Sequence, residues 1–315
     1  MRRTGIGAAA GGLAAVLSFG AIADEAFVTN QSSEDVSIID LDTGDTRATV
    51  SVGGKPAGIA LSPDGGTAWI VSPESKTVSG IDTAAGKVTR RIVLDGGPLG
   101  IAVHPDGETL YVADWYDAKV HVIDAAQGKA VGSIAVGRSP SGLAVTPDGG
   151  SLLSADRDSD QVSVVDTKTR KRVATVPTGE RPFGITIHDG RAYTADVGSN
   201  TVTVIDIAAR RPVGRIRVGE RPYAVAFARG RGFVTDQYAD TVTVFDVETL
   251  TVIGKIDVGE YPEGIDVTPD GARVIVANWF SNTISVIDAE TLDVVEEYDT
   301  GDGPRAFGLF IRETE

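Results

Sequence analysis

Residues 258–271 read Val258-Gly259-Glu260-Tyr261-Pro262-Glu263-Gly264-Ile265-Asp266-Val267-Thr268-Pro269-Asp270-Gly271, and close copies of this segment recur along the chain. The first proline of the segment marks each copy, at Pro56, Pro98, Pro140, Pro182, Pro222, Pro262 and Pro304. Successive prolines are 42, 42, 42, 40, 40 and 42 residues apart, which makes seven copies. A period near 40 residues, with glycine turns and short strand patterns in each copy, is typical of repeats that bury each other's faces.

Each copy is predicted to form four β-strands. The first follows the proline, as in residues 100–103, and ends in a Pro-Asp-Gly turn. The second and third are apolar or β-branched, as in residues 110–113 and 201–206, and the fourth is more charged, as in residues 213–218. Because the second and third strands are apolar or small on both faces, each sheet needs a neighbour on both sides. The sequence therefore predicts an all-β, seven-bladed β-propeller with four-stranded blades.

The first strand of each copy is predicted to line the axis of the ring. The smallest residues stand two positions after each proline, as expected where strands crowd together: Gly58, Gly100, Gly142, Gly184, Ala224, Gly264 and Ala306. The positions that follow are predicted to pack between blades: Ile59, Ile101, Leu143, Ile185, Val225, Ile265 and Phe307. The N-terminal copy lacks a first strand, and residues 305–311 are predicted to supply it, so that the two ends of the chain close the ring.

The beginning of the chain does not follow the repeat. Met1-Arg2-Arg3 precedes a small, apolar run, and Ala21-Ile22-Ala23 has the small-x-small pattern of a cleavage site. We predict a signal peptide in residues 1–23, cleaved after Ala23, and one propeller domain in residues 24–315. The protein is then periplasmic or secreted, with no membrane span in its mature form, and we expect a monomer.

Charge and composition limit the function classes. Loss of Arg2 and Arg3 with the signal peptide changes the formal net charge from −15 to −17, which opposes non-specific contacts to nucleic-acid phosphates. The chain has no cysteine, which excludes disulfides, a thiolate nucleophile, a cysteine zinc site and thioether haem attachment. The sequence also lacks the P-loop and Gly-x-Ser-x-Gly patterns.

The repeat carries a recognisable motif. Leu110-Tyr111-Val112-Ala113-Asp114, together with residues 26–30, 120–124 and 136–149, resembles the YVTN-type β-propeller repeat family. Over residues 26–311 the chain resembles the exported, seven-bladed YncE-like members of that family. The resemblance implies the propeller fold. For function it implies a cell-surface module, an accessory protein of a periplasmic redox enzyme, or a single-stranded nucleic-acid binder of the YncE type.

Metal and cofactor sites are not favoured by the sequence. His104 and His188 precede equivalent turns in separate copies and His121 lies in a third strand, so we expect no convergence on a metal or haem and predict no cofactor. Residues 156–160 resemble an EF-hand calcium loop but lack its glycine and distal glutamate; a solvated turn is favoured and calcium stays an alternative. The acids that end each third strand are predicted to cap turns: Asp40, Asp82, Asp124, Asp166, Asp206, Asp246 and Asp288.

The loops at one end of the ring depart from the repeat and are the predicted binding site. They carry Trp115, Tyr116, Arg157, Arg181, Phe183, Arg221, Tyr223, Gln237, Tyr238, Tyr261, Trp279 and Phe280. We expect an exposed ring of aromatic side chains with arginines, suited to a protein or a small ligand. In the alternative, Trp115 and Trp279 fold back as lids, and Arg181 and Arg221 pair with Glu180 and Glu220.

Three functions follow. The favoured one is a non-enzymatic binding or scaffold protein that uses this loop face. The second is a single-stranded nucleic-acid binder in which the aromatic residues stack on bases. The third is a hydrolase or lyase that uses Asp266, the one acid at a channel position where the other copies have Ala60, Ala102, Ala144, Thr186, Ala226 and Gly308. A single acid without a partner makes an enzyme the weakest of the three.

Overall fold

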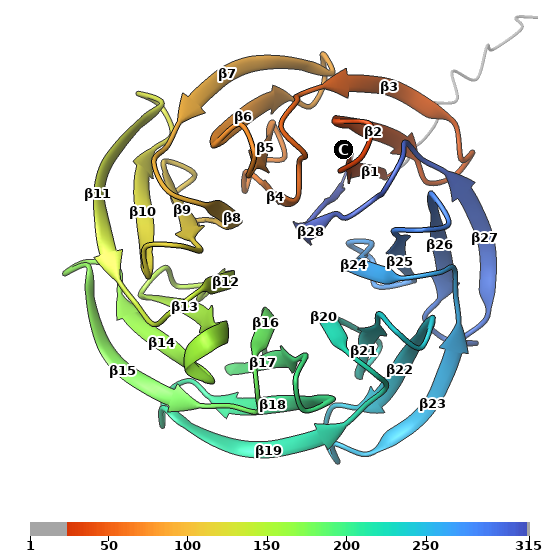
Figure 1. The fold of residues 1–315 in the computed structure, drawn as a ribbon. Coiled ribbons are helices and arrows are strands. Elements are labelled where there is room, and N and C mark those ends of the chain that lie inside the picture. The colour runs from red at the N-terminus through yellow and green to blue at the C-terminus, as the bar shows by residue number, and fades with distance from the viewer. Residues whose placement is uncertain (1–23, 314–315) are drawn as a thin grey trace, which may run out of the picture.

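The structure is a computed structural model that describes residues 24–313, so the predicted signal peptide lies outside the described residues. Seven β-sheets surround a central axis, and each is a blade of a β-propeller (Figure 1). The predicted seven-bladed fold with four-stranded blades is confirmed. The only helix of the described residues is the single-turn η1 (Arg157–Ser159), and no helix in this part of the chain has the length and apolar character of a membrane span.

Blades 1 to 4 occupy the first half of the chain. Blade 1 is built from β1 (Glu25–Asn30), β2 (Asp35–Asp40) and β3 (Thr46–Ser51). Blade 2 contains β4 (Gly58–Leu61), β5 (Thr67–Ser72), β6 (Thr77–Asp82) and β7 (Lys87–Val93). Blade 3 contains β8 (Pro98–Val103), β9 (Thr109–Asp114), β10 (Lys119–Asp124) and β11 (Lys129–Ala135). Blade 4 contains β12 (Pro140–Val145), β13 (Ser151–Asp156), β14 (Gln161–Asp166) and β15 (Lys171–Pro177), with η1 between β13 and β14.

Blades 5 to 7 complete the ring. Blade 5 contains β16 (Pro182–His188), β17 (Arg191–Asp196), β18 (Thr201–Asp206) and β19 (Arg211–Arg217). Blade 6 contains β20 (Pro222–Ala228), β21 (Arg231–Asp236), β22 (Thr241–Asp246) and β23 (Val252–Asp257). Blade 7 contains β24 (Pro262–Val267), β25 (Arg273–Asn278), β26 (Thr283–Asp288) and β27 (Val294–Asp299). The C-terminal segment adds β28 (Phe307–Leu309) and β29 (Ile311–Arg312).

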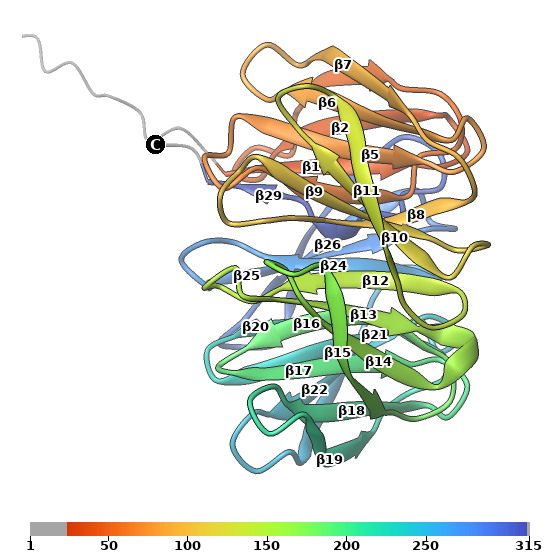
Figure 2. The same ribbon diagram turned by 90° about the vertical axis from the view of Figure 1, so that its left-hand side faces the viewer.

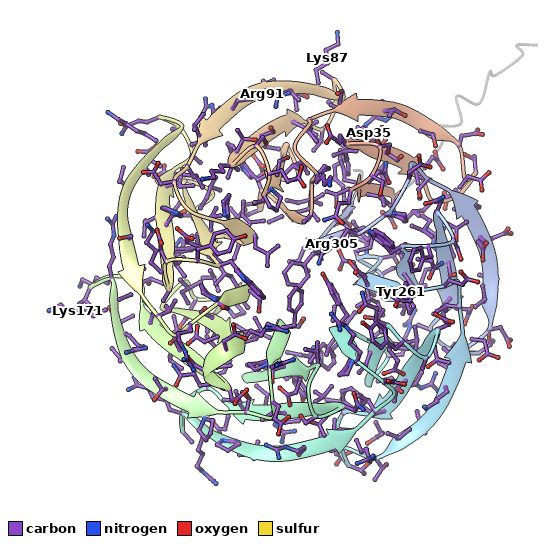
Figure 3. All side chains as sticks on the ribbon, in the orientation of Figure 1. Asp35, Lys87, Arg91, Lys171, Tyr261 and Arg305 are labelled. Atoms are coloured by element: carbon purple, nitrogen blue, oxygen red, sulfur yellow. The ribbon has the colours of Figure 1, made fainter. Side chains whose placement is uncertain are left out.

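Burial follows the order of strands within a blade. The second and third strands are buried on both faces, as in β9 and β10, whereas the fourth strand, as in β11, is exposed at nearly every position. Adjacent blades supply the cover, because the apolar clusters join the central strands of one blade to those of the next. The charged fourth strands form the outer rim, where Figure 3 shows Lys87 and Lys171 pointing into solvent.

The C-terminal segment closes the ring with two short strands. β29 pairs antiparallel with β1, at Ile311 with Ala26 and Arg312 with Glu25, and so completes blade 1 as predicted. β28, which precedes β29 in the chain, does not join blade 1. It pairs in parallel with β4, which makes the sheet of blade 2 five-stranded. The C-terminal segment therefore joins the first two blades, a detail that the sequence did not indicate.

The small residues near the axis are required by backbone crowding. A Cβ atom on Gly100 would lie 1.9 Å from the carbonyl oxygen of Ser141 in the next blade, and one on Gly184 would lie 2.4 Å from that of Tyr223. The predicted reason for these glycines is confirmed. The predicted turn caps are confirmed as well, because each third-strand aspartate accepts a backbone N–H from the following turn.

Candidate functional site

A β-bulge at the start of the first strand sets the direction of the side chains at one end of the channel. In blades 3 to 7 the pairing register shifts between the proline and the third residue after it, for example between Pro182 and Ile185. The two residues in between are not paired across the sheet, as is usual in a bulge. Two of the bulge residues that directly follow a proline, Phe183 and Tyr223, are large and aromatic.

Aromatic side chains fill the channel at the end where the first strands begin. Phe183 contacts Tyr223 with 4.6 Å between ring centroids and Phe307, from the opposite side of the ring, with 4.9 Å. All three are at least 93% buried. Leu99 and Trp115 pack around them. We call Phe183, Tyr223 and Phe307 the aromatic plug, because they close this end of the channel.

An ion pair between a partly exposed arginine and a buried carboxylate lies beside the plug. The guanidinium of Arg305 donates to the hydroxyl of Tyr223 at 2.6 and 2.8 Å, and its Nε lies 3.0 Å from a carboxylate oxygen of Glu263. Gln237 donates to the other carboxylate oxygen. Burial raises the pKa of Glu263, and the charge of Arg305 opposes that shift. Figure 3 shows Arg305 close to the axis of the ring.

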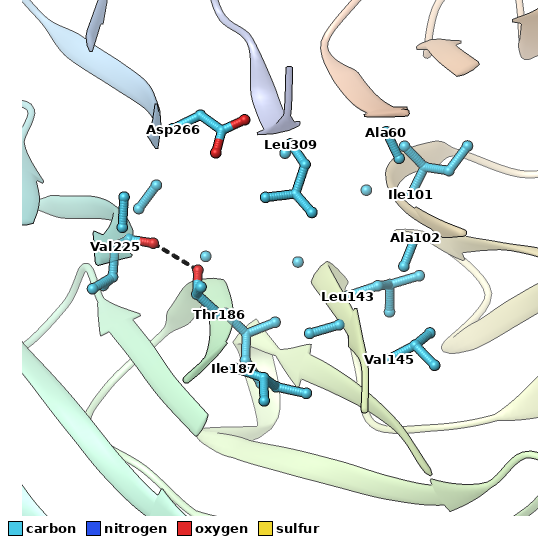
Figure 4. A pocket seen from close by; sticks show the side chains of 18 of the residues that line it. Ala60, Ile101, Ala102, Leu143, Val145, Thr186, Ile187, Val225, Asp266 and Leu309 are labelled. Carbon is cyan, nitrogen blue, oxygen red and sulfur yellow. Dashed lines mark hydrogen bonds between the residues drawn. The ribbon is translucent and has the colours of Figure 1, made fainter. Parts of the chain in front are cut away.

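The other end of the channel is an open cavity of about 630 Å³ (Figure 4). Its wall contains the small side chains that face the axis: Ala60, Ala102, Ala144, Thr186, Ala226, Asp266 and Gly308. Beyond these lie larger apolar residues, which we call the mouth ring: Leu61, Val103, Val145, Ile187, Phe227, Val267 and Leu309. Every member of the mouth ring is partly exposed, and Leu309 is 62% exposed. The opening of the cavity is therefore mainly apolar, and Thr186 and Asp266 are polar groups in its wall.

Asp266 is the acid in the wall of this cavity, as its position in the repeat predicted. Its Oδ2 accepts N–H groups from Phe310 at 2.7 Å and Ile311 at 2.9 Å, and its Oδ1 accepts that of Val267 at 2.9 Å. Burial raises the pKa of this carboxyl to about 6, and the three N–H groups oppose the shift. Asp266 thus anchors the closing strand and still presents a carboxyl group to the cavity (Figure 4).

Five of the predicted site residues form a continuous surface outside the plug, which we call the aromatic–arginine surface: Arg221, Tyr238, Tyr261, Trp279 and Phe280. Arg221 lies over the ring of Tyr238 at 4.7 Å and donates to its hydroxyl at 2.9 Å. Tyr238 contacts Tyr261 at 5.3 Å, Tyr261 contacts Phe280 at 4.5 Å, and Phe280 contacts Trp279 at 4.6 Å. Tyr238 is 45% and Phe280 53% exposed.

The backbone beneath this surface holds Arg221 and Tyr261, the residues before Pro222 and Pro262, in a left-handed conformation. Its φ is 55° at Arg221 and 57° at Tyr261, against 68° at Gly303 in the equivalent position. The N–H at this position donates to a side-chain oxygen of the preceding blade. Arg221 donates to Asn200, and Tyr261 donates to Asp240. A non-glycine residue costs about 1–3 kcal/mol in such a conformation. The loop therefore carries an arginine and a tyrosine where glycine fits without strain.

The remaining predicted site residues separate into several environments. Phe183, Tyr223 and Gln237 are buried, so the expectation of an exposed aromatic ring is wrong for them. For Phe183 and Tyr223 the bulge accounts for the difference, because it turns the side chains toward the axis rather than toward solvent. Gln237 lies outside the bulges and is buried where its amide donates to Glu263. Phe307 was expected between blades and lies in the plug instead, since β28 shifts toward β4.

The structure also tests the alternative in which tryptophans act as lids and arginines pair with neighbouring glutamates. Trp115 is half-buried against the plug with the guanidinium of Arg157 over it at 5.4 Å, which agrees with its alternative role as a lid. Tyr116 is 78% exposed. Ion pairs in the described residues involve other arginines, and neither Arg181 nor Arg221 pairs with Glu180 or Glu220, so that alternative is wrong.

The histidines do not converge. Both ring nitrogens of His104 are engaged, with the carbonyl of Gly149 and the N–H of Asp106. His121 is buried against Asp114 at 3.2 Å. His188 stacks on Phe227 at 4.4 Å and borders the cavity.

The acids of residues 156–160 each have partners of their own. Asp156 is buried against Ser154 and Ser163, so the expectation of a solvated turn is wrong for this residue. Asp158 binds Arg157 and Ser139, and Asp160 accepts the N–H of Arg181.

Sequence reasoning missed Arg305 and Glu263. Both directly follow a repeat proline, where the other copies carry Ala57, Leu99, Ser141, Phe183 and Tyr223. Opposite charges at equivalent positions of adjacent copies were the available signal, because these positions lie side by side in the ring.

Comparisons with known proteins place this fold in a family. The family described as Cytochrome D1 heme domain matches residues 17–191, more than half of the 315-residue chain, and the family described as YNCE-like beta-propeller matches residues 222–301. No curated protein sequence is significantly similar to the chain.

Three solved structures share the fold. Hydrazine synthase of Kuenenia stuttgartiensis has a TM-score of 0.73 at 22% identity, covering 80% of this chain and 89% of that one. A functionally unknown protein from Desulfotomaculum acetoxidans has 0.76 at 14% identity, covering 90% and 99%. The dihydro-heme d1 dehydrogenase NirN in complex with DHE has 0.69 at 18% identity, covering 91% and 75%. Together with the seven blades, the family matches show that this chain is a YncE-like seven-bladed β-propeller that belongs to the Cytochrome D1 heme domain family.

Proposed function

We propose that this protein is an exported, non-enzymatic binding propeller that holds a protein partner on the aromatic–arginine surface. The observation that carries the proposal is the chain of contacts from Arg221 through Tyr238, Tyr261 and Phe280 to Trp279, which spans two blades. Tyr238 and Phe280 are exposed, and the other three residues are partly exposed. Aromatic and arginine side chains provide large contact area at low entropic cost and are enriched among the residues that dominate binding energy.

The charges of this face favour a partner with carboxylates. Arg181 and Arg221 are not engaged with Glu180 or Glu220, and Arg181 is exposed. Arginine binds carboxylates through two parallel hydrogen bonds. The partner surface is therefore expected to combine apolar side chains, which cover the aromatic residues, with acids that meet the two arginines.

A haem, which the family name implies, does not fit the residues of this channel. A haem needs an axial ligand, and His188 is the one histidine that lines the cavity. Its ring stacks on Phe227 and its Nε2 lies 3.3 Å from a carboxylate oxygen of Asp189, so it is not directed at the centre of the channel. No lysine or arginine is among the described residues that line the cavity, so the carboxylates of a haem lack cationic partners there, and Asp266 adds a like charge. The aromatic plug fills the opposite end.

An accessory role beside a periplasmic redox enzyme is the second candidate. It is favoured by the match to the Cytochrome D1 heme domain family and by the shared fold with hydrazine synthase and NirN. This candidate is compatible with the proposed surface, because the redox enzyme is then the protein held there. It predicts that the captured partner carries the redox cofactor.

Single-stranded nucleic acid is the remaining alternative. Exposed aromatic rings beside Arg221 are suited to base stacking, but the net charge of −17 after loss of residues 1–23 opposes it. A fluorescently labelled oligonucleotide at low salt distinguishes the two. An anisotropy change that Tyr238→Ala and Phe280→Ala abolish would favour nucleic acid over a protein partner.

The test uses variants that preserve the backbone. Arg221→Gly and Tyr261→Gly remove two side chains at positions where the left-handed conformation suits glycine, and Tyr238→Ala and Phe280→Ala remove two more. Lys55→Gly is the matched control, because Lys55 occupies the same backbone position, with φ 54°, outside this surface. Each protein is expressed in its own host, and its partners are identified after crosslinking.

A stoichiometric partner that is retained by wild type and Lys55→Gly and lost by the four-residue variant is the expected result. Calorimetry with the purified partner should then show a loss of at least about 100-fold in affinity for the variant. If a partner binds wild type and the four-residue variant equally well, the aromatic–arginine surface is not its binding site and the proposal fails.

A further inference from the structure

We propose that the open end of the axial channel is a second, independent binding site for a small organic amine, with the apolar body in the cavity and the ammonium group on Asp266. This site lies at the opposite end of the channel from the aromatic–arginine surface. Its existence does not depend on the function proposed above, because the plug separates the two.

The cavity has the size and walls of a small-molecule site. Its volume of about 630 Å³ falls within the range of roughly 300–1,000 Å³ that is usual for ligand pockets. The aromatic plug closes it below, and small side chains such as Ala102 and Ala144 leave the centre open. A ligand can therefore enter from one side only.

The mouth ring gives the site its apolar character. All its members are aliphatic or aromatic, and each remains partly exposed although it faces a concave surface. Covering this surface removes apolar area from water, which is favourable by about 25 cal/mol per Å². Leu309, at 62% exposed, stands beside Asp266 at the opening (Figure 4).

The polar group in the wall selects the charge of the ligand. Oδ2 of Asp266 already accepts two backbone N–H groups, whereas Oδ1 accepts one, from Val267. A carboxylate oxygen accepts two hydrogen bonds, so Oδ1 has room for a donor from the cavity. Thr186 is not available for this purpose, because its hydroxyl donates to the carbonyl of Val225 at 2.7 Å.

Anionic ligands are disfavoured at the same site. No lysine or arginine is found among the described lining residues, and His188 at the edge is turned against Asp189 at 3.3 Å. An anion would meet the carboxylate of Asp266 without a compensating cation. An ammonium group instead gains a charge-assisted hydrogen bond, which is stronger than a neutral one.

Three indoles of equal ring size test the proposal on the intact protein. Tryptamine is cationic, 3-methylindole is neutral and indole-3-propionate is anionic, and calorimetry measures the affinity of each. We expect tryptamine to bind at one site per chain, at least about tenfold more tightly than 3-methylindole, as a hydrogen bond to a charged group implies. Indole-3-propionate should bind most weakly.

Two variants locate the binding. Asp266→Asn should abolish the preference for tryptamine over 3-methylindole without weakening 3-methylindole. Ala144→Phe should fill the cavity and abolish binding of all three, and it leaves Asp266 untouched, so the test survives if Asp266→Asn unfolds. The proposal is overturned if none of the indoles binds, if indole-3-propionate equals tryptamine, or if Ala144→Phe binds tryptamine as wild type does.

Discussion

The two ends of the axial channel are built from the same seven first strands, yet one is closed and the other is open. At the closed end, large side chains directly after the repeat prolines cross the axis, as Phe183 and Tyr223 do. At the open end, three residues further along each strand, small side chains such as Ala102 and Ala144 leave a cavity. The residue directly after the proline lies in the bulge and is not paired across the sheet, whereas the residue three positions later is paired. One repeat can therefore carry a large side chain at the first position and a small one at the second.

The chemistry of the ends differs in the same way. The closed end holds a pair of opposite charges, Arg305 and Glu263, with 3.0 Å between Nε and a carboxylate oxygen. The open end holds a single acid, Asp266, which is satisfied by backbone N–H groups. Charge at the closed end is paired with an opposite charge, whereas charge at the open end is directed toward the cavity.

Removal of Arg305 should have the largest effect on stability. Arg305→Ala leaves Glu263 buried without its cation, and breaking a buried pair in this way costs about 3–5 kcal/mol. Urea unfolding should show the loss. The paired variant Arg305→Met with Glu263→Gln removes both charges and should lose much less. Equal losses in the two proteins would mean that packing, and not charge, holds the closed end.

Opening the plug should have the next largest effect. Phe183→Ala removes a buried ring that contacts Tyr223 and Phe307, at a cost of about 3 kcal/mol. It should also expose Trp115, whose ring lies 6.3 Å from that of Phe183, to quenching by iodide. Phe27→Ala, in the core of blade 1, is the control and should lose stability without added quenching. Unchanged quenching in Phe183→Ala would show that the end stays closed.

The pH dependence of stability should report on the open end. The pKa of Asp266 is raised to about 6 in the folded protein from its ordinary 3.8. Its stabilising contribution is therefore complete below the unfolded value and is lost as the pH rises through about 6. Because water reaches the cavity, we expect a gain of about 1 kcal/mol between pH 7.5 and 4.5, a fraction of the full shift.

Asp266→Asn isolates this contribution. Other buried acids with raised pKa values, such as Asp156 and Asp196, gain in the same direction and do so equally in both proteins. Acids with lowered pKa values, such as Asp106, change the stability in the opposite direction, mainly below pH 4.5. The free energy of unfolding of the wild type minus that of the variant should fall as the pH rises from 4.5 to 7.5. A constant difference would place the titration of Asp266 elsewhere.

The smallest effect should come from the surface outside the plug. The contact of Arg221 with Tyr238 is exposed, so a double-mutant cycle with Arg221→Ala and Tyr238→Ala should give a coupling of only about 0.5–1 kcal/mol. Tyr238→Phe keeps the ring and removes the hydroxyl that accepts from Arg221, and it should retain most of the coupling. A coupling above that of the buried pair would reverse the comparison between surface and channel.

Much of the fold was predictable because the repeat makes each inference seven times. The prolines, the small residues at the axis and the third-strand aspartates all mark local backbone requirements, and those are visible in the sequence. The pairing of β28 was not predictable, because residues 307–309 follow the repeat pattern of a first strand of blade 1. The sequence does not show that they pair with β4 of blade 2 instead.

The candidate site was less predictable for a physical reason. Loop position indicated that Phe183 and Tyr238 share one face, but the direction of each side chain depends on the bulge and on the width of the channel. Tyr238 therefore lies at the surface while Phe183 lies across the axis. The cavity could be anticipated from the small residues equivalent to Asp266, although its closure at one end could not.

The C-terminal clasp gives the ring a weak point in mechanical terms. β29 is joined to β1 by two register pairs, and β28 is joined to β4 by three. A pulling force applied behind Arg312 would peel β29 away first and β28 second, before any complete blade is loaded. In a single-molecule stretching experiment the ring should therefore open at its seam in small early steps, followed by larger events as whole blades unravel.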